Sequence, residues 1–331
     1  MPSANSYSSG IPSSIGNRED IQDILSVIAP ESTPVTSAIS TGPAANATTI
    51  ETVVDTLRAP RTTGTPEGQD QAVFSNKSVN RARIGNYIHI LSDSYGVTDV
   101  EAKVDVAAAK GGLYAEAKAK CITEMKRDME SVICGDQDRT QGSGETGWTT
   151  RGLFDWIDSA GPSDVPAANR TSGSSIIAGH TEANITAMLQ NLFNIYGEPK
   201  NFFMPAGLTI CNDFDTFAAT QVAANVASNT VSAVGNNNGY VTGRSVNRTI
   251  NRYVTSMGSL DIVPDVFLSL SAGAGSATKA LVLNLDLLSL RYLENFHTVD
   301  MEDKGGGPRG YAKVIFALQC KNPLGLGKIT A

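Results

Sequence analysis

Histidine and cysteine side chains are the groups in this sequence most able to carry out catalytic or metal chemistry. The three histidines and four cysteines are His89, His180, His297, Cys121, Cys134, Cys211 and Cys320. The spacings HExxH and CxxC place two ligands on one zinc ion. No histidine here lies in an HExxH pattern, and no two cysteines are spaced as CxxC. We therefore expect structural or exposed histidines and buried thiols in a reducing compartment, without a metal site or a disulfide framework.

Two acids and one glycine-rich stretch are the remaining candidates for chemistry. Asp213 and Asp215 are spaced as a carboxylate pair, but acids are also favoured at the N-terminus of a helix. The stretch 325–328 is similar to the end of a phosphate-binding loop, yet Asn322 and Ile329 stand where such a loop needs glycine and serine or threonine. An acidic hydrolase built on the aspartates and the scattered histidines remains an alternative that no spacing supports. We expect no enzyme, no catalytic residue and no cofactor.

The composition favours a protein that shares contacts with other chains. Aromatic residues make up 6% and charged residues 18% of the 331 residues, so the chain has few large side chains for a core. The formal net charge of -7 repels phosphate backbones and argues against a dedicated nucleic-acid binder. No apolar run approaches the roughly 20 residues that a membrane-spanning helix needs.

The longest helix indicated by the hydrophobic pattern runs over residues 110–134. Its apolar residues step by three and four, which is the period of a helix that packs one face on a sheet. That apolar face contains Leu113, Ala117, Cys121, Ile122, Met125, Met129, Val132 and Ile133. The opposite, charged face contains Glu116, Lys118, Lys120, Glu124, Lys126, Arg127, Asp128 and Glu130. We expect Met125 and Met129 to be buried against the sheet.

A long polar insertion separates two β-rich runs, 49–57 and 86–91. The insertion, 58–85, has five basic residues against two acidic ones, which gives it a net charge of +3. The basic residues are Arg58, Arg61, Lys77, Arg81 and Arg83, the acidic residues are Glu67 and Asp70, and the apolar anchors are Val73 and Phe74. Long loops with so few core residues often reach for a partner, so we expect a two-stranded arm that projects from the body.

The first 43 residues form an expected N-terminal arm of opposite charge. This arm begins with a Ser/Gly-rich stretch and contains a short helix that ends at Pro30. Its one basic residue and four acidic residues, Arg18, Glu19, Asp20, Asp23 and Glu31, give a net charge of -3. The N-terminal arm and the insertion 58–85 therefore carry opposite net charges.

The remaining chain alternates helices and strands without internal repeats. We expect a helix capped by Thr181 and ended by Gly197, and a second helix capped by Asn212 or Asp213. Strands are expected over 201–204, 280–285, 288–293 and 311–320, with a hairpin that joins 247–256 to 260–263. The expected fold class is therefore α+β.

Three stretches of this sequence resemble one family. The N-terminal stretch NREDIQDILSVIAPESTPVTSAIS (17–40) resembles the opening of a coat-protein branch found in podophages and siphophages. The run through Lys120–Met129 resembles the end of that branch's spine helix, and Ala312–Val314 with 321–325 resembles its last strand and tail. Together with the order of the elements, these stretches resemble the tailed-bacteriophage major capsid proteins, which have the Hong Kong 97-type coat fold.

The resemblance implies a division of the chain into parts. The N-terminal arm would be 1–43, and the extension loop with its flanking strands would be 44–97. A peripheral domain would combine 98–180 and 279–331 around the spine helix 110–134, and an axial domain would be 181–278. The loop and the arm would contact neighbouring subunits. The residues expected there are Arg58, Arg61, Val73, Phe74, Lys77, Arg81, Arg83, Glu19, Asp20 and Asp23.

The resemblance also implies a structural function. The protein would self-assemble into hexamers and pentamers of an icosahedral shell that encloses packaged double-stranded DNA without sequence-specific binding. It would be made in the host cytoplasm and reside in the virion, with no membrane association. The portal protein, scaffolding proteins and decoration or cement proteins are its expected partners. An encapsulin-like compartment shell of the same fold, marked by an enzyme cargo, is the alternative.

Overall fold

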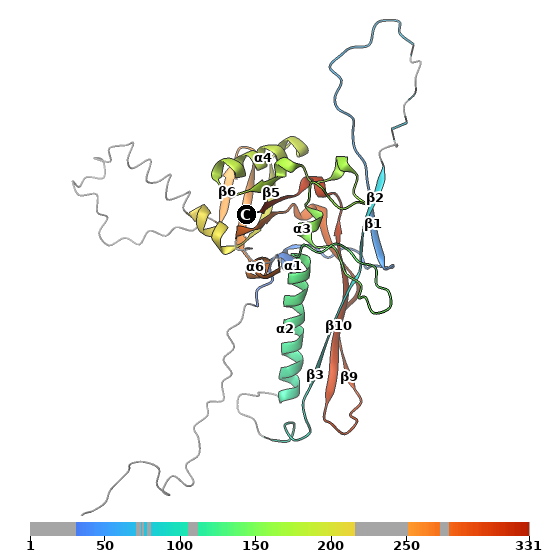
Figure 1. Ribbon diagram of the computed structural model, residues 1–331, viewed down its shortest axis with the longest axis vertical. Coiled ribbons are helices and arrows are strands. Elements are labelled where there is room, and N and C mark those ends of the chain that lie inside the picture. Colours follow the sequence, from blue (N-terminus) through green and yellow to red (C-terminus); the bar gives the residue numbers. More distant parts are fainter. Residues whose placement is uncertain are drawn as a thin grey trace, which may run out of the picture.

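The computed structural model describes residues 31–70, 74, 76–77, 81–104, 112–215, 251–271 and 278–330. One long helix lies along a three-stranded sheet, while a six-stranded sheet and a two-stranded ribbon lie toward the other end of the molecule (Figure 1). Helices and largely antiparallel strands coexist, as expected for an α+β fold. None of the helices within the described residues is long and apolar enough to cross a membrane.

The spine helix is α2 (Leu113–Ile133), and it buries the face expected from its sequence. Met125 and Met129 are each only 1% exposed, which confirms the prediction that both methionines are buried. Both belong to one core cluster with side chains of β3 and β10, including Tyr95 and Phe316. The first two residues of the expected helix, 110–111, lie outside the described residues.

The spine helix packs on an antiparallel sheet with the strand order β3-β10-β9. These strands are β3 (His89–Gly96), β10 (Arg309–Cys320) and β9 (Leu288–Met301). The prediction of a strand over 288–293 was too short, because β9 pairs with β10 as far as Met301. Beyond Leu293 the side chains of β9 are exposed or half-buried, so the sequence carries no alternation of apolar residues there.

A separate two-stranded ribbon forms the base of the expected arm. It consists of β1 (Thr49–Val54) and β2 (Ala82–Tyr87), which pair antiparallel. Beyond the ribbon the chain from Asp55 to Thr62 has no regular structure, and Figure 1 shows this loop projecting from the body. The expected two-stranded arm is therefore strand-like only at its base. The expected strand 86–91 is divided between β2 and β3, which belong to different sheets.

A six-stranded mixed sheet has the order β4-β11-β8-β5-β7-β6. Its strands are β4 (Ile176–Ala178), β11 (Gly327–Thr330), β8 (Ala280–Val282), β5 (Lys200–Ala206), β7 (Gly258–Pro264) and β6 (Arg252–Thr255). The strand β5 confirms its sequence prediction, and so does the hairpin β6–β7, although residues 247–250 of the predicted hairpin lie outside the described residues. The strand predicted over 280–285 was too long, because β8 ends at Val282 and a 3-10 turn begins at Leu285. The short strands β4 and β11 were not predicted, because stretches of three and four residues are too short to show an alternation of apolar and polar side chains.

Helix α4 (Glu182–Tyr196) covers one face of this sheet (Figure 1). The hydroxyl of Thr181 accepts the backbone N–H of Asn184, and Gly197 adopts a left-handed conformation with φ 72°, so both predicted caps are confirmed. The prediction that Asn212 or Asp213 caps the next helix was wrong. That helix already starts at residue 208, which places both residues in its interior.

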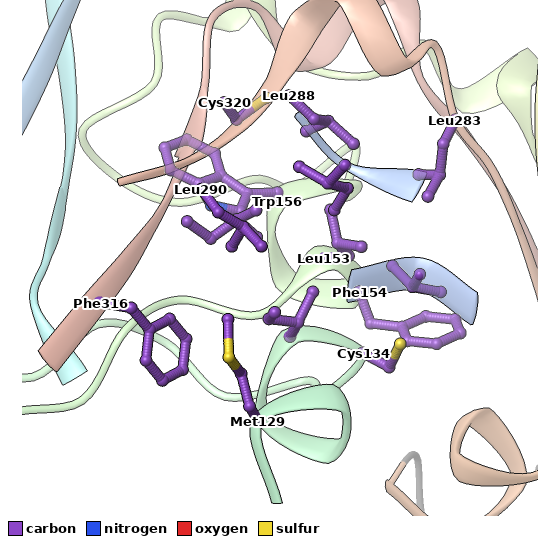
Figure 2. Close-up of a cluster of buried hydrophobic side chains, with 14 of the residues drawn as sticks. Met129, Cys134, Leu153, Phe154, Trp156, Leu283, Leu288, Leu290, Phe316 and Cys320 are labelled. Carbon is purple, nitrogen blue, oxygen red and sulfur yellow. The ribbon is translucent and has the colours of Figure 1, made fainter. Parts of the chain in front are cut away.

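The main core lies between α2, the strands β3, β9 and β10, and a short helix, α3 (Leu153–Trp156) (Figure 2). Three further helices lie within the described residues: α1 (Pro34–Ala38), α6 (Val266–Ser271) and the segment over 208–215. In the sequence, the stretch 152–157 stands out as the only apolar anchor of an otherwise irregular region. The structure buries its largest side chain, Trp156, almost completely.

Candidate functional site: the projecting loop and its anchor

The projecting loop is joined to the body through Asn86, a buried residue of β2. Its side-chain amide donates to the carbonyl oxygen of Leu318 in β10 at 2.8 Å. Its side-chain oxygen accepts the backbone N–H of Arg151 at 2.8 Å. An amide can satisfy a carbonyl and an N–H together, so this one side chain ties the ribbon both to the central strand of the three-stranded sheet and to the loop after α2.

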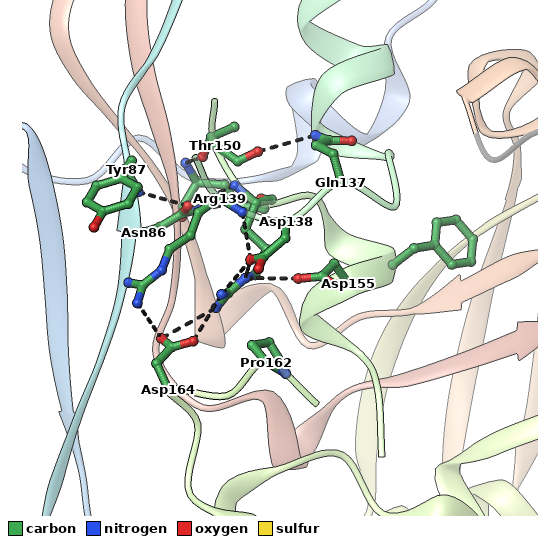
Figure 3. A network of polar contacts seen from close by, with 12 residues as sticks. Asn86, Tyr87, Gln137, Asp138, Arg139, Thr150, Asp155, Pro162 and Asp164 are labelled. Carbon is green, nitrogen blue, oxygen red and sulfur yellow. Dashed lines mark hydrogen bonds and ion pairs between the residues drawn. The ribbon is translucent and has the colours of Figure 1, made fainter. Parts of the chain in front are cut away.

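Arg151 is the centre of a buried ion-pair network (Figure 3). Its side chain is 2% exposed, and its Nη2 lies 2.6 Å from Asp138 Oδ1 and 2.9 Å from Asp164 Oδ1. Its Nε lies 2.9 Å from Asp155 Oδ2, and its guanidinium stacks 4.6 Å from the ring centroid of Trp156. A planar guanidinium with five donors suits this arrangement, which a lysine could not reproduce.

Arg139 extends this network to the ribbon. Its Nη1 donates to the carbonyl oxygen of Gly85 in β2 at 2.7 Å, and its Nη2 pairs with Asp164 Oδ2 at 3.3 Å. Its guanidinium also lies 5.2 Å from the ring centroid of Tyr87. We call Arg139, Arg151, Asp138, Asp155 and Asp164 the arginine cluster. Because Arg139 of this cluster binds the backbone of β2, the cluster helps to fix the direction in which the loop leaves the body.

The acids of the arginine cluster differ in their pKa values. Burial raises the pKa of Asp155 to about 6, and the neighbouring carboxylate of Asp138 acts in the same direction, while Arg151 partly opposes both. Burial also acts to raise the pKa of Asp164, but the hydrogen bond and charge of Arg151 outweigh it and leave that pKa below its usual value. The cluster therefore holds Asp164 firmly ionised, whereas Asp155 titrates close to neutrality.

The basic residues predicted on the loop do not form one surface. Arg81 pairs with Asp55 at 3.3 Å, and Arg83 pairs with Glu51 at 3.6 Å, both across the ribbon. Farther out, Arg58, Arg61, Lys77 and Phe74 are exposed, the last by 88%. The remaining predicted contact residues, Val73, Glu19, Asp20 and Asp23, lie outside the described residues.

Two exposed apolar residues at the base of the projecting loop were not named in the sequence analysis. Val53 in β1 is 61% exposed, and Leu57 just beyond the ribbon is fully exposed at 100%. Their position in a β-rich run suggests that they are buried. The structure shows instead that β1 and β2 form a sheet of their own, and these side chains lie on a part of it that no other element covers within the described residues. An isolated two-stranded ribbon is marginal on its own, so these side chains offer apolar area to another surface.

Glu130 was expected on the charged face of the spine helix, and this prediction was wrong. It is fully buried, and its two carboxylate oxygens accept the backbone N–H groups of Val35 and Thr36 at 2.7 Å each, together with the Thr36 hydroxyl. The donors belong to α1, a short helix within the N-terminal arm. One spine-helix acid therefore fixes the point at which that arm joins the body.

Glu130 also belongs to a buried trio with Cys134 and Asp265, whose ligand atoms lie within 4.8 Å of one another. A metal ion would need those atoms as ligands, but they already serve protein groups. Asp265 accepts the N–H of Phe267 at 2.9 Å and lies 3.8 Å from the Cys134 sulfur, while both Glu130 oxygens bind α1. Burial raises the pKa of all three groups, which favours neutral forms and not metal ligation.

Of the other residues considered for chemistry, the structure brings His180 and Asp213 into contact. All four cysteines are free thiols, as expected. Burial lowers the pKa of His89 to about 4, so this ring is neutral at pH 7. His180 Nε2 lies 2.6 Å from Asp213 Oδ2, a pair that the sequence analysis did not foresee.

Solved structures from phages and one encapsulin align with nearly the whole chain. The chain aligns with a structure from Gordonia phage Cozz at a TM-score of 0.57 and 12% identity, covering 100% of this chain and 97% of the other. The capsid structure of cyanophage P-SCSP1u aligns at 0.55 and 12%, covering 98% and 95%. The SrpI encapsulin complex of Synechococcus elongatus aligns at 0.50 and 13%, covering 95% and 92%. At these identities the likeness shows the fold, which is that of a phage capsid subunit.

The amino-acid sequence identifies the family to which the chain belongs. The family of SU10 major capsid proteins matches residues 6–331, nearly the whole chain. No curated protein sequence gives a significant match. The chain therefore belongs to the SU10 major capsid protein family. It is a structural protein of the virion that forms a capsid shell with copies of itself, and the family role is not enzymatic.

Proposed function

We propose that this capsid protein builds an icosahedral shell of hexamers and pentamers around packaged double-stranded DNA. The observation that carries the proposal is the projecting loop, whose exposed residues Leu57 and Phe74 have no cover within the described part of the subunit. Such side chains are stable in water only at a cost that a neighbouring subunit removes. The acidic composition, with a net charge of -7, suits a wall that encloses DNA without binding its sequence.

The proposed inter-subunit contacts are the extension loop and the N-terminal arm. They comprise Arg58, Arg61, Val73, Phe74, Lys77, Arg81, Arg83, Glu19, Asp20 and Asp23. The division into a peripheral domain of 98–180 and 279–331 and an axial domain of 181–278 belongs to this proposal. The two main core clusters support it in part, although the strand β8 contributes to both, with Leu281 in one cluster and Val282 in the other.

The proposed partners beyond the protein itself are a portal protein at one vertex, scaffolding proteins, and decoration or cement proteins. A closed shell needs one opening for the genome, and a subunit with long arms benefits from guidance during closure. No membrane partner is proposed.

Limited proteolysis combined with negative-stain electron microscopy tests the proposal. Trypsin should cut unassembled subunits at Arg58 and Arg61, because the loop there is exposed and has no regular structure. The same sites should be protected in closed shells. Purified protein that never forms shells, or shells that are cut as fast as free subunits, would overturn the proposal.

An encapsulin-like compartment is the second candidate, favoured by the structural match to the SrpI encapsulin complex. The two candidates differ in their contents. Shells purified from the native source should contain double-stranded DNA if the first is right, whereas a compartment would contain an enzyme cargo.

A further inference from the structure

The N-terminal arm is held on the spine helix by a buried acid. Glu130 is fully buried, and its oxygens accept the backbone N–H groups of Val35 and Thr36 at 2.7 Å each, with the Thr36 hydroxyl as a third donor. In the described part of the chain, no lysine, arginine or histidine forms an ion pair with Glu130 or with its neighbour Asp265. The docking of α1 therefore depends on hydrogen bonds to Glu130 and not on a counter-charge.

A second buried carboxyl group lies beside Glu130. Asp265 is 1% exposed and stands between β7 and α6, where its Oδ1 accepts the N–H of Phe267 at 2.9 Å. Oxygen atoms of Glu130 and Asp265 lie within 4.8 Å of each other and of the Cys134 sulfur. Burial raises the pKa of both carboxyl groups, and the charge of Asp265 adds to this effect on Glu130, while the hydrogen bonds from α1 oppose it. Two ionised carboxylates this close repel each other strongly away from water, so the pair is more stable while it retains a proton.

Three helices, α1, α2 and α6, pack around this pair of acids. Neither α1 nor α6 contains a titratable side chain. From α2 come Cys134, whose pKa is raised by burial, and Arg127, whose guanidinium lies 5.6 Å from the ring centroid of Phe267. The thiol therefore stays neutral, and the two carboxyl groups determine how the site responds to pH.

We propose that Glu130 and Asp265 form a proton-linked latch for the N-terminal arm, in which a proton held by the pair keeps α1 docked and its loss releases α1. A protonated Glu130 still accepts an N–H group through its carbonyl oxygen, and the Thr36 hydroxyl can turn to accept the new proton. When both acids are ionised, their repulsion is relieved if Glu130 gives up α1 and is solvated. The latch acts within one subunit, so this inference goes beyond the proposed function.

The expected direction follows from the raised pKa values of the two acids. A group whose pKa is raised on folding binds its proton more tightly in the folded state, so its stabilising contribution is present at low pH and is lost as the pH rises through that raised pKa. Release should stop at Ser40, because its carbonyl oxygen accepts the N–H of Leu290 at 2.9 Å.

Hydrogen exchange of the unassembled subunit, followed by mass spectrometry from about pH 5.5 to about pH 9, tests the latch. The readout is the protection of a peptide covering 33–39, corrected for intrinsic exchange with the unfolded chain. Above the titration of the pair, this protection should fall by up to about ten-fold per pH unit, whereas helix α4 should keep its protection.

Three variants separate the two acids from a general effect of charge. D265N removes the repulsion, and its amide oxygen can still accept the N–H of Phe267, so 33–39 should stay protected to higher pH. The matched control D70N removes one exposed carboxylate elsewhere and should behave like the parent. E130Q replaces one acceptor oxygen by a donor, so the protection of 33–39 should be low at every pH.

Protection of 33–39 that does not change with pH, or that falls together with the protection of α4, would overturn the latch. A D265N curve that coincides with the parent curve would overturn it as well. If E130Q does not fold, the comparison of D265N with D70N decides the question. None of these results depends on shell formation, so the latch and the proposed function can fail independently.

Discussion

Replacing Arg151 by methionine removes the guanidinium that contacts Asp138, Asp155 and Asp164 together. Methionine preserves most of the aliphatic packing. The hydrogen bonds between the Arg151 backbone and the Asn86 side chain also remain, so the variant tests the loss of the charged guanidinium. Asp138 is 64% exposed and can be solvated, but Asp155 and Asp164 are only 25% and 17% exposed. Breaking a buried pair by removing one partner costs about 3–5 kcal/mol. We expect R151M to lower the free energy of unfolding by about that amount.

Equilibrium urea unfolding of the unassembled subunit measures this loss. The control is R83M, which removes an arginine whose side chain is 77% exposed and should cost about 0–1 kcal/mol. Adding D155N to R151M removes one of the stranded carboxylates, so the double variant should regain part of the lost stability. If R151M unfolds at the same urea concentration as R83M, or if D155N lowers its stability further, the electrostatic account of the cluster is wrong.

Three further predictions concern the titration of the cluster, the spine helix and a helix cap. The pKa of Asp155 is raised from 3.8 to about 6, so the folded state binds this proton more tightly than the unfolded state. The contribution of Asp155 to stability should therefore fall as the pH rises from about 4 to about 6, and D155N should flatten this part of a stability-versus-pH curve; an unchanged slope would contradict the assignment. Met125→Ala should cost about 2–5 kcal/mol in urea unfolding, since the side chain is 1% exposed, whereas K126A at the neighbouring exposed position should cost little. Thr181→Ala should cost about 1 kcal/mol through loss of the cap on α4, measured by thermal unfolding, and T181S should retain most of it.

The elements predicted well from the sequence are those whose signal is local. The apolar face of α2 and the capping residues Thr181 and Gly197 are short-range features, and the structure has them where they were expected. The projecting insertion 58–85 was predictable because a stretch with so few apolar residues cannot offset the entropy of ordering on its own.

The anchor of the loop was not predictable from the sequence. Arg151 and its partner Asp164 are 13 residues apart in a region without periodicity, and Asn86 is 65 residues from Arg151. Nothing in the order of residues marks these as one cluster. Glu130 was misplaced for a related reason. It follows a run of charged residues, and only the docking of α1, with donors 94 and 95 residues away, shows why an acid is buried there.

Ile88 is the single residue between the end of β2 and the start of β3, and it is buried. Its N–H bonds to the carbonyl oxygen of Thr48 at 3.1 Å, so even this residue is fixed. The ribbon therefore has no hinge at its base. A force applied to the ribbon by an adjoining subunit passes directly into β3 and from there into the sheet behind the spine helix. Any change in the direction of the ribbon relative to β3 must therefore be accommodated at Ile88, where burial and the hydrogen bond to Thr48 both oppose it.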